Sequence, residues 1–301
     1  MNTPIAESEL ILNPNGSIYH LNLLPGDLAE TIITVGDPER VPMVSRYFDS
    51  IEHKAQKREI VTHTGYLNNK RISVISTGMG TGCIDIVLNE IDALFNIDFE
   101  TRQIKEKLTS LNIIRIGTAG SLQAHIPIDS YVVSNYAIGL DNLLYSYNPH
   151  YSPKELKILN AFVNHMSTEE RILTPYIKSS ASSLTNLFTA DFFSGITATC
   201  SGFYAPQGRE LRGELAIPNF ITLLQEFQYE EYCIANFEME TAAIYGLGHI
   251  LGHQCCSISA IVANRAVQQF SHNPYASVDQ LIQLTLEKIT ATEPLTYSNM
   301  Q

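Results

Sequence analysis

RISVISTGMGTGCIDIVLNEIDALF at residues 71–95 contains a complete strand, turn and helix, and this unit decides the fold class. Its first part, RISVIS at 71–76, predicts a strand that ends in the glycine-rich turn at 78–82. The apolar residues after the turn recur at helical spacing: Ile84, Val87, Leu88, Ile91, Leu94 and Phe95. This spacing predicts an amphipathic helix directly after the turn.

Strand-like and helix-like segments alternate on both sides of this unit. We expect further strands at 31–35, 112–116, 130–138, 195–200 and 256–263. We expect helices after Pro38 and at 153–165, 240–251 and 277–291. This alternation indicates an α/β fold, and we predict one three-layer α/β/α domain over residues 1–301 with a mixed central sheet.

The composition fits one globular domain without a membrane partner. Of 301 residues, 45% are hydrophobic and 17% are charged, which supplies one large core and excludes a disordered chain. No apolar run reaches the roughly 18–20 residues that cross a bilayer. The N-terminus carries two glutamates and no early basic cluster, unlike a signal peptide, so we expect a cytoplasmic protein.

Cysteine and histidine usage favours neither disulfides nor a metal site. The five cysteines form no CxxC pair and include the adjacent Cys255 and Cys256, so we expect reduced thiols. His249 and His253 stand four residues apart on an expected helix, as in a zinc protease. The glutamate of that motif is absent, so we interpret both as histidines on the helix surface.

The charge pattern favours a small anionic ligand. A formal net charge of −12 argues against a nucleic-acid surface, which needs a basic patch. Three expected strands end in glycine-containing turns: VGDPER at 35–40, STGMGTG at 76–82 and RIGTAG at 115–120. Ligands of open α/β sheets bind at such strand ends, and two of these turns carry an arginine. We therefore expect an anion site, the alternative being ordinary strand-to-helix turns.

One of these turns is close to a dinucleotide-binding motif. Gly78, Gly80 and Cys83 follow a strand and open a helix, and Asp98 lies twenty residues beyond Gly78. The third position is cysteine instead of glycine or alanine, and Asp98 follows the helix without a convincing second strand. Both features disfavour a dinucleotide cofactor.

Seven motifs, in this order, resemble the uridine phosphorylase branch of the nucleoside phosphorylase family. They are VGDPERV at 35–41, KRE at 57–59, STGMG at 76–80, RIGTAG at 115–120, GFYAPQGRE at 202–210, FEMETA at 237–242 and IVANR at 261–265. The resemblance covers roughly residues 19–290, which leaves 1–18 as an N-terminal extension. It implies a nucleoside phosphorylase-like fold with one pocket for phosphate, ribose and base.

The resemblance implies the residues of each part of that pocket. The phosphate-binding residues would be Gly36, Arg40, Arg58, Arg115 and Thr118. The ribose-binding residues would be His20, Thr118, Met239 and Glu240. The base-binding residues would be Phe203, Gln207, Arg209 and Glu238. Arg115, Gln207, Arg209 and Glu240 would carry catalysis. Planar guanidinium groups suit phosphate because they form charge-assisted, often bidentate hydrogen bonds.

The base-binding pair distinguishes the branches of the family. Uracil presents an acceptor, a donor and an acceptor, which a glutamine and an arginine can match. Purine-cleaving relatives use an aspartate where this chain has Asn264-Arg265. Three positions depart from the family's pattern: Gln-Gly-Arg at 207–209, Ala119, and Thr-Gly-Cys at 81–83. The last removes a serine that holds a monovalent cation in some relatives, so we expect no such ion.

The resemblance implies a pentosyltransferase that converts uridine and phosphate to uracil and ribose 1-phosphate. Phosphate would be the co-substrate, with no further cofactor or metal. In similar enzymes residues such as His20 and Arg58 reach the neighbouring subunit's site, so we expect at least a homodimer. Alternatives are a purine phosphorylase or nucleoside hydrolase on the same scaffold, or a catalytically silent nucleoside-binding protein.

Overall fold

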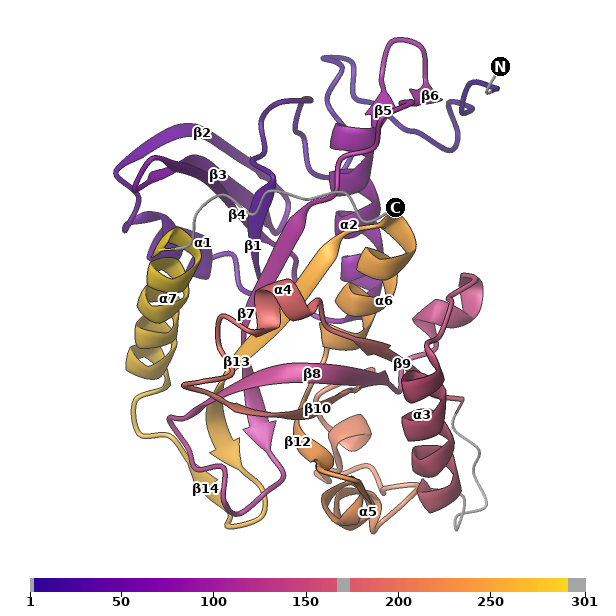
Figure 1. Ribbon diagram of the computed structural model, residues 1–301, viewed down its shortest axis with the longest axis vertical. Helices are drawn as coiled ribbons and strands as arrows, with labels where there is room; N and C mark the ends of the chain where they lie inside the picture. The colour runs from indigo at the N-terminus through magenta and orange to yellow at the C-terminus, as the bar shows by residue number, and fades with distance from the viewer. Residues whose placement is uncertain (1–2, 167–173, 292–301) are drawn as a thin grey trace.

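The structure is a computed structural model that describes residues 3–166 and 174–291 (Figure 1). The strands of the main sheet are β1 (Thr31–Val35), β2 (Ser50–Lys57), β3 (Ile60–Leu67), β4 (Lys70–Ser76), β7 (Asn112–Ser121), β8 (Tyr131–Gly139), β9 (Tyr176–Ser179), β10 (Phe193–Thr199), β11 (Gln228–Tyr229), β12 (Tyr232–Glu238), β13 (Gln254–Asn264) and β14 (Gln269–Phe270). The helices are α1 (Arg40–Ser45), α2 (Thr81–Asn96), α3 (Pro153–Met166), α4 (Ser182–Thr185), α5 (Phe220–Glu226), α6 (Thr241–Leu251) and α7 (Pro274–Ala291). These elements confirm the predicted α/β class.

The sheet is mixed, as predicted, and part of it closes on itself. Its order is β11-β12-β10-β8-β13-β7-β1-β4-β3-β2. Strands β4, β1, β7 and β13 are parallel neighbours, whereas β8 runs antiparallel to β13. Strand β12 also pairs with β7, so β7, β13, β8, β10 and β12 form a closed ring. This closure brings the end of β12 against the second half of β7.

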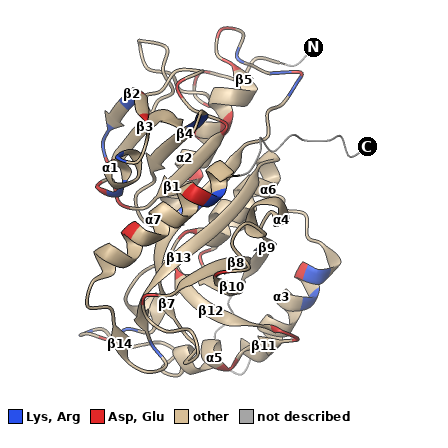
Figure 2. Cartoon of the chain, turned by 60° about the vertical axis from the view of Figure 1, so that its left-hand side comes forward, with Lys and Arg blue, Asp and Glu red and all other residues tan. Residues whose placement is uncertain are grey.

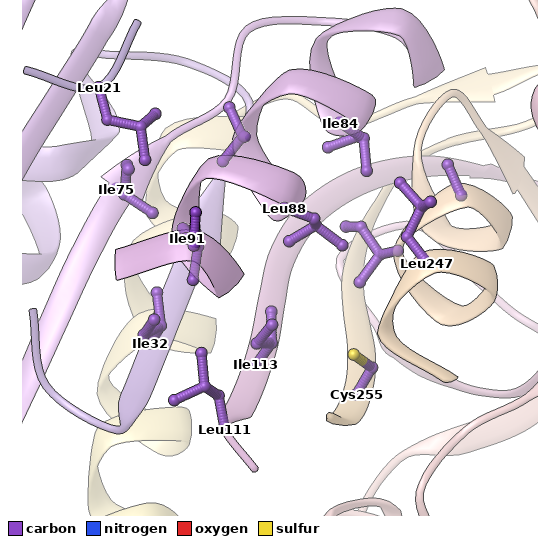
Figure 3. Packing of buried hydrophobic residues seen from close by; sticks show 14 of the residues in the cluster. Leu21, Ile32, Ile75, Ile84, Leu88, Ile91, Leu111, Ile113, Leu247 and Cys255 are labelled. Carbon is purple, nitrogen blue, oxygen red and sulfur yellow. The ribbon is translucent and has the colours of Figure 1, made fainter. Parts of the chain in front are cut away.

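Helices cover both faces of the sheet because neighbouring strand residues point to opposite sides. Ile32, Ile113 and Cys255 face α2 and α6, in the cluster shown in Figure 3. The residue that follows each of these in its strand, such as Ile33 after Ile32, points to the other face of the sheet. These residues pack in a second cluster, under α1, α4 and α7. A third cluster packs α3 and α5 on β8, β10 and β12. The predicted three layers are therefore present.

Strand β7 corrects the prediction that residues 117–120 form a turn. The strand continues to Ser121, because β13 pairs with it along its whole length and β12 pairs with its last residues. The glycines of this segment do not form a turn. They leave room for side chains to lie close to the strand backbone. A Cβ at Gly117 would overlap the Arg115 guanidinium, and one at Gly120 would lie 3.3 Å from the Phe237 ring.

Other differences from the predictions concern shorter elements and one histidine. The β2–β3 hairpin and strand β12 were not predicted, because their sequences mix polar and apolar residues without clear alternation. Helix α6 ends at Gly252, whose φ of 82° stops the helix. His253 therefore lies beyond the helix and is buried, which corrects its assignment to the helix surface.

Basic and acidic residues are interspersed along the described part of the chain. Lys and Arg are scattered over β2, α1 and α3 in the view of Figure 2, with acidic residues among them. Among the described residues no helix is long and apolar enough to span a bilayer. All five cysteines are free thiols.

A buried ion pair joins α3 to β9 in the region where the sequence pattern is weakest. Lys178 donates to Glu155 Oε2 at 3.1 Å and to the His150 carbonyl at 2.7 Å. Both charged side chains are at most 2% exposed. The Glu155 carboxylate also accepts from the backbone of Ser152 and Ser179, at 2.7 and 2.8 Å. Both oxygens of Glu155 and two of the three N–H groups of Lys178 are thus hydrogen-bonded inside the protein.

Replacing Lys178 with Met should lower the free energy of unfolding by about 3 kcal/mol, because Glu155 then stays buried without its countercharge. Urea unfolding followed by circular dichroism measures this change. Lys154→Met is the matched control, since Lys154 pairs with Glu230 at the exposed end of the same helix and should have little effect. Equal losses in both variants would contradict the assignment.

Candidate active site

Arg115 is the centre of a buried charge cluster at the carboxyl end of several strands. Its Nη2 lies 2.6 Å from Glu240 Oε2 and 2.9 Å from Glu238 Oε2. Its Nη1 donates to Ser259 Oγ on β13 at 3.3 Å. Burial opposes the charge, but the two carboxylates outweigh burial and raise the pKa of Arg115. A buried arginine of β7 is therefore compensated, as its position in NIIRIG requires.

Glu238 is held by donors on every side. It ends β12, and its oxygens accept from Thr199 Oγ1 at 2.7 Å and from the backbone N–H groups of Glu240 and Thr241 at 2.9 and 3.0 Å. The last two groups open α6, where a negative charge is favourable. These contacts and Arg115 hold Glu238 in the charge cluster. The role in base binding that the resemblance implied stays a prediction.

Glu240 links the cluster to the glycine-rich turn after β4. Its Oε1 accepts from the Gly80 N–H at 2.7 Å, while its Oε2 accepts from Arg115. Gly80 has a φ of 92°, a conformation that glycine adopts without strain. Burial raises the pKa of Glu240, Arg115 opposes the shift, and Glu238 adds to it. The turn thus binds a protein carboxylate by its backbone.

Of the other predicted phosphate residues in this region, Arg40 borders the cluster. Arg40 opens α1, and its Nη1 donates to the Ile116 carbonyl at 3.3 Å. Burial lowers the pKa of Arg40, and the nearby charge of Arg115 lowers it further. Gly36 follows the last residue of β1, and Thr118 lies half-buried in β7. The Glu240 carboxylate attracts both arginines, which offsets part of their positive charge.

A second cluster, the base cluster, follows β10 and contains three of the four predicted base-binding residues: Phe203, Gln207 and Arg209. Arg209 Nη1 donates to Gln207 Oε1 at 2.6 Å and to the Phe203 carbonyl at 2.7 Å, and its guanidinium lies 3.8 Å from the Phe203 ring centroid. Arg265 donates to the carbonyls of Gln207 and Gly208 at 3.2 and 3.3 Å. Burial and the Arg265 charge lower the pKa of Arg209. The structure thus brings Phe203, Gln207 and Arg209 together as predicted.

The backbone connects the two clusters. Cys200 follows Thr199 directly, and its N–H donates to the Glu238 carbonyl at 2.8 Å. Residues 200–209 therefore leave β10 at the point where Thr199 binds the Glu238 carboxylate. Met239 lies half-buried between Glu238 and Glu240. The charge cluster and the base cluster are adjacent parts of one site.

Asn264 takes no part in that site. Its amide donates to the carbonyls of Gln123 and Ile126 at 3.0 and 2.8 Å, and its Oδ1 accepts from the backbone of Ala266 and Val267. All of its hydrogen-bonding capacity is used inside the protein. Of the pair predicted to replace the purine-specific aspartate, only Arg265 adjoins the base cluster.

His20 and Arg58 lie in two segments that contact each other, the chain at 13–21 and the β2–β3 hairpin. Arg58 is exposed at the tip of the β2–β3 hairpin, with a φ of 54°. Lys57, beside it, donates to the Tyr19 carbonyl, which precedes His20. Over residues 3–166 and 174–291, neither His20 nor Arg58 bonds to the charge cluster. Arg58 is thus exposed on a hairpin whose tip lies beside the glycine-rich turn after β4.

Two contributors to the site were missed in the sequence. Thr199 holds Glu238, and Ser259 contacts Arg115. The signal available for both was a hydroxyl inside a buried strand, in TATC at 197–200 and SISA at 257–260. Within the part of the chain described, no three His, Cys, Asp or Glu side chains gather in an arrangement that could hold a metal.

Comparisons with known proteins show the family of the chain. Residues 30–292 match the model of the phosphorylase superfamily. A uridine phosphorylase of Thermococcus kodakarensis is 30% identical over 85% of this chain and 80% of its own length. A DeoD-type purine nucleoside phosphorylase of Colwellia psychrerythraea is 24% identical over 90% of this chain and 98% of its own.

A solved structure extends the match to the whole fold. It is the Trypanosoma brucei nucleoside phosphorylase, described as showing uridine phosphorylase activity. It superposes with a TM-score of 0.83 and 29% identity, over 94% of this chain and 100% of its own. The resemblance of the seven motifs is confirmed, and the chain belongs to the phosphorylase superfamily.

Proposed function

We propose that this chain is an enzyme that cleaves uridine with inorganic phosphate, giving uracil and ribose 1-phosphate. The observation that carries the proposal is buried Arg115, which lies between two carboxylates and beside Arg40. That arrangement offers cations to a phosphate and carboxylate oxygens to sugar hydroxyls in one place. Several similar proteins are named uridine phosphorylases, including that of Thermococcus kodakarensis.

Arg40 and Arg115 bind the phosphate in this proposal, with Gly36 and Thr118 completing the cage. The backbone of Gly36 approaches the anion closely, and the Thr118 hydroxyl donates to it. The bound phosphate directs one oxygen at the anomeric carbon of the sugar. Because Arg115 is already bonded to Glu238 and Glu240, phosphate engages its remaining N–H groups.

Glu240 fixes the ribose in this proposal. Its carboxylate accepts from the vicinal hydroxyls, while the Gly80 N–H holds it in place. Met239 packs beneath the sugar ring. A charged acceptor that is already oriented by the protein needs no reorganisation when the substrate arrives.

Gln207 and Arg209 bind the uracil edge, and Phe203 stacks on the ring. As the glycosidic bond breaks, its electron pair moves to the uracil, and positive charge develops on the ribose. Arg209 stabilises the first charge and the phosphate stabilises the second. A phosphate oxygen then bonds to the anomeric carbon, so the reaction proceeds by positioning and electrostatics without a covalent enzyme intermediate. The scheme calls on no cofactor besides phosphate.

The alternatives differ from this proposal at particular residues. In hydrolysis the nucleophile is water, which does not require two arginines at its position. Purine-cleaving relatives protonate the base with an aspartate. This chain has Asn264 at that place, and the Asn264 side chain is bonded internally. A silent binding protein has no need of a desolvated charge cluster as costly as that of Arg115. We favour the pyrimidine phosphorylase on these grounds.

We also propose that the enzyme works in the cytoplasm as a homo-oligomer of at least two chains. His20 and Arg58 reach the neighbouring subunit's site, His20 toward the ribose 5′-hydroxyl and Arg58 toward the phosphate. Arg58 is exposed and the His20 side chain is partly exposed, and neither bonds to its own charge cluster among the described residues, which supports this assignment.

Turnover of uridine should vanish in phosphate-free buffer and return when phosphate is added. Arg40→Ala should raise the KM for phosphate by about 10²-fold, because a desolvated cation at the anion is lost. A coupled assay of uracil release measures both effects. Arg46→Ala is the control from the other end of α1, where Arg46 is exposed and pairs with Asp279. Equal rates with and without phosphate would favour a hydrolase.

Arg209→Ala should lower kcat/KM for uridine by roughly 30- to 1000-fold, because a charge-assisted contact to the leaving base is lost. Phosphate binding, measured by calorimetry, should change little. Arg212→Ala tests the same loop at an exposed position and should be almost silent. If the wild-type enzyme cleaves inosine as fast as uridine, the assignment of the pocket to a pyrimidine is wrong.

A shared site predicts complementation between two inactive variants. Arg58→Asn, chosen because asparagine tolerates the positive φ, removes the contribution to the neighbour, and Arg209→Ala removes the base contact within the chain. Coexpressed in equal amounts, they should recover about a quarter of the wild-type activity, since random pairing gives mixed dimers with one complete site each. Light scattering should give at least a dimer. An active monomer would refute the shared site.

A further inference from the structure

Glu90 holds the His20 segment by three N–H groups. This residue lies on α2, seventy positions from His20 in the sequence. Its carboxylate accepts from the His20 ring at Nδ1 (2.5 Å) and from the backbone N–H groups of His20 and Leu21 (2.9 Å each). The Glu90 side chain is only 14% exposed, so these contacts are partly shielded from water. The sequence motifs give this residue no role.

The contact to the ring decides which nitrogen of His20 carries the proton. A carboxylate is a pure acceptor, so Nδ1 must donate to it. In the neutral ring Nε2 is then an acceptor, directed away from Glu90. The His20 side chain remains 26% exposed, and its edge packs against the Tyr19 ring at a centroid distance of 4.8 Å. The ring is fixed in direction and still open at Nε2.

A separate set of contacts anchors the chain before His20. Asn13 donates to Ser17 Oγ and to the Ile18 carbonyl, at 2.9 Å each. Lys57 donates to Asn13 Oδ1 at 2.9 Å, and its Nζ lies 4.5 Å from the Tyr19 ring centroid. None of these anchoring bonds involves the imidazole. Glu90 therefore adds something beyond attachment, namely the orientation of the ring.

We infer that Glu90 is a positioning residue for sugar recognition: it sets the tautomer and direction of His20, so that Nε2 accepts a hydrogen bond from the nucleoside's 5′-hydroxyl. This inference rests on the proposed function, in which His20 reaches the neighbouring subunit's ribose. A hydroxyl is a suitable partner because it can donate to an acceptor nitrogen. Through His20, Glu90 then contributes to the enzyme's preference for nucleosides whose sugar carries a free 5′-hydroxyl.

The test compares uridine with 5′-deoxyuridine, which lacks the hydroxyl. His20→Ala and Glu90→Ala should each raise the KM for uridine by about 3- to 10-fold, the value of one hydrogen bond, with kcat nearly unchanged. Neither should change the KM for 5′-deoxyuridine. The double variant should be no worse than His20→Ala, because Glu90 acts through His20. Glu90→Gln, which keeps an acceptor oxygen, should restore part of the affinity.

Asn13→Ala is the matched control, since it loosens the same segment without touching the ring. It should leave the ratio of the two KM values as in the wild type. If Asn13→Ala reproduces the Glu90 variants, or if these impair both nucleosides equally, Glu90 is only an anchor and the inference is wrong. Wild-type enzyme that cleaves neither nucleoside with phosphate would instead overturn the proposed function. Thermal unfolding of each variant identifies any that do not fold, and Glu90→Gln then carries the test.

Discussion

The ion pairs of Arg115 with Glu238 and Glu240 are the constraint on which the site depends. An unpaired guanidinium in the middle of a sheet would be very costly, so the fold must supply countercharges there. It does so by pairing β12 with the second half of β7, which brings Glu238 to the arginine. The same pairing needs the glycines of β7, because Arg115 lies over Gly117 and Phe237 over Gly120. Sheet closure and the charge cluster thus require each other.

The main effect of these contacts is that both carboxylates of the site are ordered before a ligand binds. Glu238 is bonded by Thr199 and by the first amides of α6, and Glu240 by Gly80, before any ligand arrives. Each of these donors comes from a different element, namely β10, α6 and the turn after β4. A carboxylate held from several directions keeps its orientation when charge develops nearby, and this is how electrostatic stabilisation lowers a barrier.

The sequence predicted the long, regular elements and the residue types of the site, but not its contacts. Strands such as β1 and helices such as α2 follow directly from apolar spacing. The extent of β7 could not be predicted, because RIGTAG has the composition of a turn and only pairing with β12 and β13 keeps it extended. The internal bonding of Asn264 and the hold of Glu90 on His20 also depend on residues far away in the chain, and local patterns carry no signal for them.

Charge balance bears on the proposed contribution of a second chain. The guanidiniums of Arg40 and Arg115 lie near three carboxylates: Asp37, Glu238 and Glu240. The charge cluster therefore carries no excess of positive charge. A phosphate carrying up to two negative charges gains little long-range attraction from such a site. The proposed arrangement changes this balance, because it adds one further cation to the phosphate site, the exposed Arg58 of a neighbouring subunit. In that arrangement, assembly shifts the charge of the site towards the positive charge that favours an anion.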